Sequence, residues 1–215
     1  MGIDDAGRGP VLGPMILAGV LAEEKDNEII KFWGAKDSKL LTPKKRAEIK
    51  EKIKEEFPNH LEISTPKEID ESSNLNYLEA IKTAMIINKL SEGQTEEIKV
   101  FVDCPSTNIE SWSNDVQKLI KNPEKIILIC EHKADLNHPV VSAASILAKE
   151  KRESELKRLK TELEIDFGSG YPADPKTKNF IKENFKNEKY KEIIRFSWKT
   201  VKKLFEGKSQ EKLFK

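Results

Sequence analysis

Acidic residues stand at the ends of the segments most typical of buried strands. Asp4 and Asp5 close a short apolar start, Asp103 closes the run Ile98–Val102, and Asp135 precedes a long apolar helix. Each acid by itself is typical of a turn or a helix cap. If three or four of them converge, their charges repel at neutral pH, so protons or divalent cations must neutralise them. The pattern makes a metal site the first hypothesis.

The ligand chemistry indicates which metal and which reaction to expect. Carboxylate oxygens favour Mg²⁺ or Mn²⁺ over Zn²⁺, while the cysteines lack CxxC spacing and the histidines lack the spacing of metal ligands. No nucleophilic serine or cysteine motif and no Walker lysine loop is present in the sequence. Two divalent cations about 4 Å apart activate a water and stabilise the leaving oxygen of a phosphodiester. We therefore expect phosphodiester hydrolysis that needs no protein nucleophile.

A glycine cluster follows the first pair of acids. Gly7, Gly9 and Gly13 do not match G-x-G-x-x-G, and Pro10 blocks the helix that a dinucleotide-binding loop requires. Arg8 lies between two glycines, so a fixed positive charge and accessible backbone donors stand just beyond the acids. A phosphate or a sugar edge can approach such a loop closely.

Strand and helix patterns alternate around these residues. We expect an α/β fold with a mixed sheet, because two early strands share a short turn and later strands are separated by helices. Ligands of such sheets lie beyond the carboxyl ends of the strands, where Asp4 and Asp103 stand. The expected strands are 1–4, 15–20, 60–64, 98–103 and 125–130, and the expected helices are 27–33, 43–57, 77–90 and 139–160. In the helix 77–90, the residues with helical spacing include Leu78, Ile81 and Met85.

Length and composition limit the class of protein. The 215 residues, 37% of them apolar, suffice for a packed core. The longest apolar stretch, Val11–Ala22, is interrupted by glycine and proline and is shorter than the roughly 18 residues that cross a bilayer. Acids occupy the place of a signal peptide's basic region, so we expect a cytoplasmic protein without a membrane anchor. The net charge of +1 hides a basic segment, 171–215, with 13 Lys and Arg against 6 Asp and Glu. Such a segment suits a phosphate backbone or a solvated lysine-rich face.

Seven motifs, taken in chain order, resemble those of the ribonuclease HII family, the type 2 ribonucleases H. The first is Gly2-Ile3-Asp4-Asp5-Ala6-Gly7-Arg8-Gly9-Pro10 with Gly13-Pro14. The others are Asp37-Ser38-Lys39, Val102-Asp103, Ala134-Asp135 with 142–149, Gly168-Ser169-Gly170-Tyr171-Pro172, Asp174-Pro175-Lys176-Thr177 and Arg195-Phe196-Ser197-Trp198. They span nearly the whole chain, which makes the resemblance specific.

The resemblance implies a fold and an activity. The fold is ribonuclease H-like, a five-stranded mixed sheet flanked by helices, with a catalytic domain at 1–170 and a basic helical lobe at 171–215. The activity is endonucleolytic cleavage of RNA in RNA–DNA hybrids and at single ribonucleotides in duplex DNA, as in ribonucleotide excision repair, leaving 3′-hydroxyl and 5′-phosphate ends. The implied cofactor is Mg²⁺ or Mn²⁺, with two ions per site, and the protein is expected to be a monomer.

The resemblance also divides the site residues into two sets. The catalytic metal ligands are Asp4, Asp5, Asp103 and Asp135. The substrate-binding residues are Gly7, Arg8, Gly9, Ser38, Lys39, Asn76 and Tyr171. In the second set, Gly7, Arg8 and Gly9 contact the 2′-hydroxyl and phosphate at an RNA–DNA junction. Tyr171 stacks on the adjacent deoxyribose, and the other three residues hold the backbone. The 2′-hydroxyl is the group that separates the two sugars.

Several alternatives stay open. The family usually has glutamate where this chain has Asp5, whose shorter side chain is expected to contact the metal through a water and to shift metal preference or rate. The chain could be a nucleic-acid-binding module without catalysis, or a nuclease of DNA junctions. Tyr171 could pack under its own loop, and Lys39 and Asn76 could be a surface lysine and a cap residue.

The last residues suggest a protein partner besides nucleic acid. Gln210 and Leu213, three positions apart, resemble the beginning of a sliding-clamp-binding peptide. The expected aromatic pair further on is missing, because the sequence ends at Lys215. Clamp binding through this tail is therefore a separate hypothesis.

Overall fold

The computed structural model describes residues 1–35 and 41–203. Contacts within the chain divide it into two compact units, each assembled from separate segments. The first unit comprises Met1–Ala6, Ile16–Ile63 and Asn74–Lys151, and the second comprises Gly7–Met15, Ser64–Ser73 and Arg152–Lys215. The division into a catalytic domain at 1–170 and a lobe at 171–215 stays a prediction.

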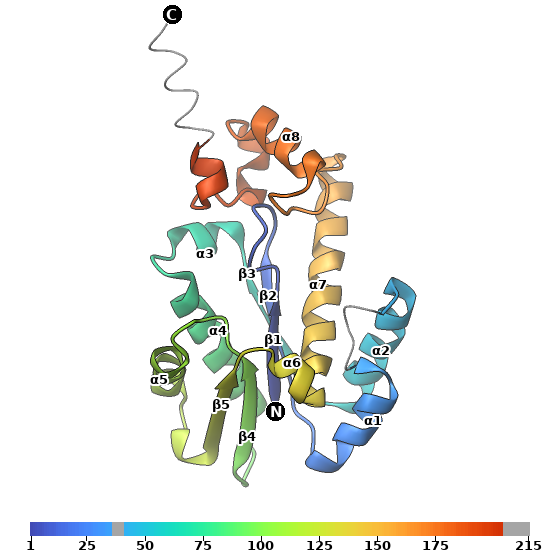
Figure 1. Ribbon diagram of the computed structural model, residues 1–215, viewed down its shortest axis with the longest axis vertical. Coiled ribbons are helices and arrows are strands. Elements are labelled where there is room, and N and C mark those ends of the chain that lie inside the picture. Colours follow the sequence, from blue (N-terminus) through green and yellow to red (C-terminus); the bar gives the residue numbers. More distant parts are fainter. Residues whose placement is uncertain (36–40, 204–215) are drawn as a thin grey trace, which may run out of the picture. The chain divides into compact units, whose positions relative to one another are not determined.

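The first unit is built on a five-stranded mixed sheet, as the sequence predicts (Figure 1). Its strands are β1 (Gly2–Ala6), β2 (Met15–Val20), β3 (Asn59–Ser64), β4 (Ile98–Asp103) and β5 (Ile126–Glu131). The order is β3-β2-β1-β4-β5, with β1 antiparallel to β2 and parallel to β4, and with β4 parallel to β5. β1 ends two residues later than expected, so Asp4 and Asp5 lie inside the strand rather than after it.

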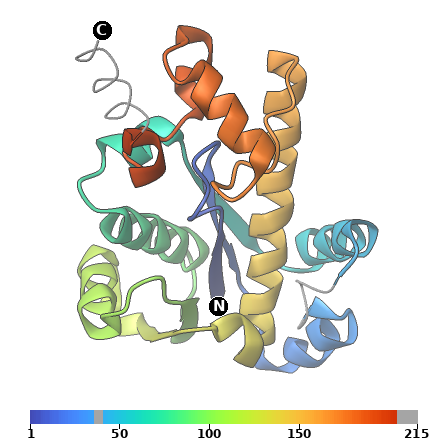
Figure 2. The ribbon, with the colours of Figure 1, turned by 45° about the horizontal axis from the view of Figure 1, so that its top comes forward.

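Helices of the first unit cover both faces of this sheet (Figure 1, Figure 2). On one face lie α4 (Leu75–Leu90) and α5 (Ile109–Leu119). On the other face lie α1 (Asn27–Phe32), α2 (Pro43–Glu56) and the first half of α7 (Pro139–Leu163). The connections include the short helix α6 (Ala134–Asn137) and the 3₁₀ turns η1 (Glu24–Asp26) and η3 (Pro123–Lys125).

Three helices are absent from the sequence prediction: α5 and α6 in the first unit and α3 (Pro66–Glu71) in the second. α3 has a clear start signal: the Glu68 N–H donates to the Thr65 hydroxyl (3.2 Å), and the Thr65 N–H donates to the Glu68 carboxylate (2.8 Å). The same Thr-Pro start opens α2 at Thr42, where the sequence predicts the helix correctly. The signal for α3 was therefore readable from the sequence.

Small residues bring α7 close to the sheet. The core on this face joins side chains of β1, β2, α1, α2, α6 and α7, and the alanines of the first half of α7 are fully buried in it. A Cβ on Gly2 would overlap the backbone of Val140 and Val141. The start of α7 thus lies against β1, the strand that carries the first two acids.

The second unit has its own apolar core. Leu12 forms an isolated β-bridge with Ile194. Around this bridge pack side chains of α8 (Pro175–Asn184), η4 (Glu188–Ile193) and the second half of α7. Phe196 and Trp198 pack against the same core.

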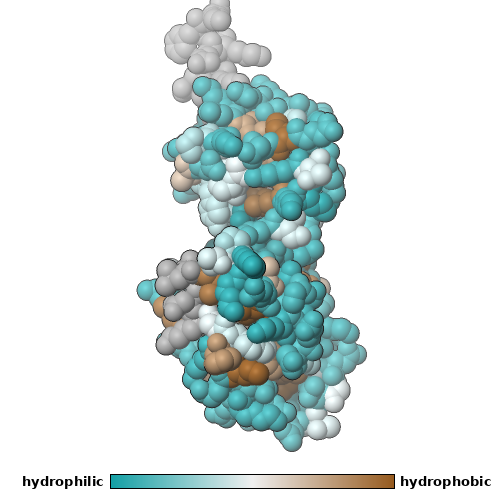
Figure 3. Space-filling model, turned by 90° about the vertical axis from the view of Figure 1, so that its right-hand side faces the viewer, coloured by the Kyte–Doolittle hydropathy of each residue, from teal (hydrophilic) through white to brown (hydrophobic). Residues whose placement is uncertain are grey.

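The surface reflects the high charged fraction of 35%. The face on the α7 side is mostly hydrophilic, with small scattered apolar patches (Figure 3). Cys104 and Cys130 are free thiols, and burial raises the pKa of Cys130 to about 11. Within residues 1–35 and 41–203, no helix is long and apolar enough to cross a membrane.

Candidate active site

The sheet brings two of the predicted metal ligands side by side. β1 and β4 are parallel neighbours, and their register pairs Ile3 with Val102. The next residues along the two strands are Asp4 and Asp103. The two carboxylates therefore lie at the same level of the sheet, toward the carboxyl ends of both strands, where ligands of α/β sheets bind.

A small cavity lies between the sheet and α4, next to the acidic ends of β1 and β4. Its polar lining consists of Asp4, Asp5 and Asp103 from the strands with Glu79 and Thr83 from α4. The rest of the lining is Ile3, Leu17, Val102, Pro105 and Trp112. The cavity volume is about 10 Å³, close to the space that one water molecule needs. Because side chains alternate along a strand, Asp4 and Asp103 turn their carboxylates to the α7 face of the sheet, and of the three strand acids only Asp5 turns toward α4.

Asp4 is held in the most perturbed environment of this cluster, at 6% exposure. Burial and the negative charges of Asp5 and Asp103 raise the pKa of Asp4 from 3.8 to about 8. Hydrogen bonds from Ser145 and from the Asp5 backbone act in the opposite direction but do not compensate. At neutral pH the Asp4 carboxyl group therefore keeps a proton unless a cation neutralises the cluster.

α7 supplies the side-chain hydrogen bond to Asp4. The Ser145 hydroxyl donates to the Asp4 carboxylate and accepts a hydrogen bond from the Lys149 ammonium (2.7 Å). Ser145 and Lys149 are four residues apart, so they lie on the same side of the helix. The sequence analysis identified residues 142–149 only as a family motif, because nothing in this segment indicates which strand residue its polar side chains contact.

The turn before α6 holds Asp103. One oxygen of the Asp103 carboxylate accepts hydrogen bonds from the backbone N–H groups of Lys133 (2.7 Å) and Ala134 (3.3 Å). Lys133 has φ of 60°, a left-handed conformation that costs a non-glycine residue roughly 1–2 kcal/mol. The strained turn directs two backbone donors at one carboxylate oxygen.

Asp135 lies near this turn but does not line the cavity with the other three acids. It is buried in the first turn of α6, and the Ser142 hydroxyl donates to its carbonyl oxygen. In the described part of the chain, no three Asp, Glu, His or Cys side chains already surround a point that could hold a metal ion. The donor chemistry of Asp4, Asp5 and Asp103 still fits a hard divalent cation, because these acids offer only oxygen and their mutual repulsion is relieved by positive charge.

In the second unit, one arginine shapes the glycine cluster. Arg195 is 0% exposed and donates to the carbonyl oxygens of Gly7 (2.7 Å), Arg8 (3.1 Å) and Gly13 (2.9 Å). Gly7 has φ of 92° and Gly13 has φ of 79°, which glycine adopts without strain. The guanidinium group satisfies three carbonyl groups of the loop at once and thereby fixes its path.

The neighbours of Arg195 hold the same region. The Trp198 indole N–H donates to the carbonyl oxygen of Gly9 (3.3 Å), and the Arg195 guanidinium lies 5.0 Å from its ring centre. The Asp70 carboxylate accepts hydrogen bonds from the N–H groups of Phe196 (2.7 Å) and Ser197 (2.9 Å). The sequence analysis identifies Phe196 and Trp198 only as part of a family motif and gives no indication of their hydrogen bonds to Asp70 and Gly9.

Tyr171 lies beside the glycine cluster of the second unit. A Cβ placed on Gly9 would lie 3.7 Å from the Tyr171 ring. The Arg152 guanidinium is 5.1 Å from the ring centre, yet Tyr171 is 43% exposed. The ring is therefore supported by protein while part of it stays open to solvent.

Of the three remaining predicted substrate-binding residues, the structure describes one, Asn76. Asn76 lies in the first turn of α4, where its carbonyl oxygen accepts a hydrogen bond from the Trp112 indole (2.8 Å) and its N–H donates to Asn74 (2.9 Å). Ser38 and Lys39 lie outside the described residues.

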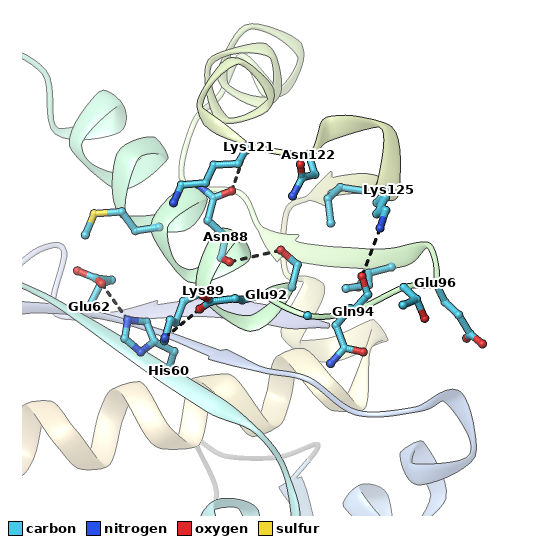
Figure 4. Close-up of a pocket in the computed structure, with 16 residues that line it drawn as sticks. His60, Glu62, Asn88, Lys89, Glu92, Gln94, Glu96, Lys121, Asn122 and Lys125 are labelled. Carbon is cyan, nitrogen blue, oxygen red and sulfur yellow. Dashed lines mark hydrogen bonds and ion pairs between the residues drawn. The ribbon is translucent and has the colours of Figure 1, made fainter.

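A larger cavity of about 720 Å³, near the C-terminal end of α4, contains none of the predicted site residues (Figure 4). Its ionic groups pair with one another: His60 lies 3.0 Å from Glu62, and Lys89 lies 3.1 Å from Glu92. Because it does not concentrate charge of one sign, we do not assign the phosphodiester chemistry to it.

Comparison with known proteins places this geometry in a family. The family model described as "Ribonuclease HII" matches residues 1–201. The chain belongs to the ribonuclease HII family. It is similar to ribonuclease HII of Pyrococcus furiosus, with 40% identity over 209 residues that cover 96% of this chain and 91% of that protein.

Solved structures of ribonuclease HII proteins share the fold. Ribonuclease H2 from Pyrococcus horikoshii OT3 superposes with a TM-score of 0.85 at 37% identity, covering 96% of each chain. RNase HII in the PCNA:RNase HII complex from Archaeoglobus fulgidus gives a TM-score of 0.82 at 35% identity, covering 94% of this chain and 95% of that one. The chain is thus a ribonuclease H-like, metal-dependent endoribonuclease that cleaves RNA in RNA–DNA hybrids.

The raised pKa of Asp4 predicts how stability depends on pH in the absence of metal. Between pH 4 and 8 the folded protein keeps a proton on Asp4 that the unfolded chain has released, so the free energy of unfolding falls as the pH rises. Urea denaturation in EDTA across this range should show the fall, and Asp4→Asn should flatten it. Asp115→Asn, the same change on the partly exposed surface of α5, serves as control. Parallel profiles for wild type and Asp4→Asn would contradict the assignment.

Proposed function

We propose that Asp4, Asp5, Asp103 and Asp135 hold the catalytic cations, Mg²⁺ or Mn²⁺, two per site. The observation that carries this proposal is the pairing of β1 with β4, which brings Asp4 and Asp103 to the same level of the sheet, together with the negative charges of Asp5 and Asp103 that help burial to raise the pKa of Asp4 to about 8. Hard divalent cations suit such all-oxygen ligands.

The bound cations would supply an activated water and neutralise the leaving oxygen of the scissile phosphodiester. The chain's own residues orient the ligands. The hydrogen bond from Ser145 holds Asp4, and the Lys133 and Ala134 N–H groups hold Asp103. Because these carboxylates are already held in place, they need little reorganisation during the reaction. The products of this cleavage would carry 3′-hydroxyl and 5′-phosphate ends.

The second unit supplies the residues that we propose distinguish ribose from deoxyribose. Gly7, Arg8 and Gly9 would contact the 2′-hydroxyl and the adjoining phosphate, in the loop whose carbonyl groups are bound by Arg195. Tyr171, partly exposed beside Gly9, would stack on the neighbouring deoxyribose. Such a pair of contacts selects a ribonucleotide followed by DNA, including a single ribonucleotide in a duplex.

Three further residues complete the proposed substrate contacts. Ser38, Lys39 and Asn76 would hold the nucleic-acid backbone. We also propose that the protein acts as a cytoplasmic monomer, with 1–170 as catalytic domain and 171–215 as a basic lobe that favours nucleic acid.

Cleavage of a duplex with one embedded ribonucleotide tests this function. With Mg²⁺ or Mn²⁺, wild type should cut at the ribonucleotide, and Asp103→Asn should cut at least about 100-fold more slowly, because it removes a charged ligand. An all-DNA duplex of the same sequence is the control and should stay intact. If neither cation supports cutting by wild type, the chain is a binding module; if the all-DNA duplex is cut, it is a different nuclease.

Asp5 gives a second test, because its reach differs from that of the usual glutamate. Asp5→Ala should raise the metal concentration for half-maximal turnover by roughly 10- to 100-fold, whereas Asp5→Glu should keep a high affinity and shift the ratio of Mg²⁺ to Mn²⁺ activity. Titration of turnover with each metal measures both effects. Unchanged metal dependence in Asp5→Ala would exclude Asp5 from the metal site.

The tail suggests a sliding clamp as protein partner. A solved relative from Archaeoglobus fulgidus is a PCNA:RNase HII complex, and Gln210 and Leu213 resemble the start of a clamp-binding peptide. The full chain should capture the clamp in a pull-down, and a chain without residues 209–215 should not. Equal capture by both chains would place clamp binding elsewhere, and no capture by either would exclude it.

A further inference from the structure

Glu131, the last residue of β5, stands beside one of the proposed metal ligands. The register of the parallel strands β4 and β5 pairs it with Asp103. Paired residues of neighbouring strands turn their side chains to the same face of the sheet, so Glu131 and Asp103 share the α7 face. Phe101, two residues before Asp103 on β4, packs against the core on this face. The family resemblance gives no role to Glu131.

The Glu131 carboxylate holds two consecutive residues at the end of α6. Its Oε1 accepts a hydrogen bond from the Asn137 side-chain amide (2.9 Å), and the His138 Nε2 lies 3.0 Å from the same oxygen. An ionised carboxylate only accepts, so Nε2 is the donor in this contact. The His138 ring also stacks on Phe101, with 4.0 Å between ring centroids and 22° between ring planes. One carboxylate and one aromatic ring thus hold the end of α6 against β4 and β5.

The same short helix carries Asp135, another of the proposed metal ligands. Asp135 lies two residues before Asn137 and is 8% exposed. At the beginning of α6, the Ala134 N–H donates to the Asp103 carboxylate (3.3 Å). A helix of four residues gains little stability from its own hydrogen bonds, so the contacts at its two ends set its orientation. Asp103 supplies such a contact at one end, and Glu131 supplies it at the other.

We infer that Glu131 is a positioning residue of the metal site: through Asn137 and His138 it sets the place of Asp135 relative to Asp103. The inference rests on the proposed role of these two acids as metal ligands. Removal of a hydrogen-bond partner that orients a metal ligand typically costs 10- to 100-fold in metal affinity. Glu131 acts through its acceptor oxygen and does not bind the cation, so a glutamine, which keeps that oxygen, can replace it.

Mn²⁺ binding to the full chain, measured by isothermal titration calorimetry, tests this inference without using activity. Glu131→Ala should raise the dissociation constant roughly 10-fold, whereas Glu131→Gln should stay within about 2-fold of wild type. Glu124→Ala removes an exposed glutamate just before the opposite end of β5 and should leave the dissociation constant unchanged. A merely structural role would lower the stability of Glu131→Ala but not the affinity of its folded molecules. Wild-type affinity in Glu131→Ala, or an equal loss in Glu131→Ala and Glu131→Gln, would overturn the inference.

Two ligand variants separate this inference from the proposed function. Asp103→Asn and Asp135→Asn should both bind Mn²⁺ more weakly; if both bind as wild type does, the proposed metal site itself is wrong. If both lose affinity while Glu131→Ala binds as wild type does, the metal site stands and the role of Glu131 is wrong. Should Glu131→Ala fail to fold, His138→Phe decides, because it keeps the stacking on Phe101 and removes the ring N–H that Glu131 accepts. Weaker Mn²⁺ binding by His138→Phe would support the inference, and wild-type binding would overturn it.

Discussion

The parallel pairing of β1 with β4 forces two carboxylates together in a buried place. Asp4 and Asp103 follow paired residues of neighbouring strands, and Asp5 comes directly after Asp4. Burial and like charge both oppose ionisation there, which is why the pKa of Asp4 rises to about 8. The same opposition favours cation binding, because a divalent ion relieves the repulsion between the ionised acids. The sheet thus favours metal binding, because it places acids where their ionised form is unfavourable unless a cation neutralises the charge.

The strand acids were predictable from the sequence, and the helix residues of the cavity were not. An acid after an apolar run points to the end of a strand, and parallel strands end at one edge. For α4, the apolar spacing favours a buried stripe with Leu78, Ile81 and Met85, but Met85 is 43% exposed while Glu79 and Thr83 are buried. Because α4 is apolar on several sides, the spacing of its apolar residues alone cannot show which side is buried. Packing against the sheet and α5 decides which side is covered.

In the second unit, too, the sequence did not show which residues contact one another, here between segments far apart in the chain. The motif around Arg195 is easily noted in the sequence, yet its partners are carbonyl groups at Gly7, Arg8 and Gly13, more than 180 residues earlier. Carbonyl groups carry no sequence signal, so no pattern could pair the two segments. A planar guanidinium with several fixed donors suits three carbonyl groups at once, which a lysine cannot match. The loop at the start of the chain therefore depends on a residue near its end.

At position 5 this chain has aspartate where the family usually has glutamate. A glutamate shortened by one methylene moves its oxygens back by roughly 1.5 Å, the length of one carbon–carbon bond. A cation is held by the sum of the charges and oxygens around it. Aspartate carries the same charge as glutamate, so the substitution at Asp5 changes the reach of one side chain and leaves the total charge of the acidic residues unchanged.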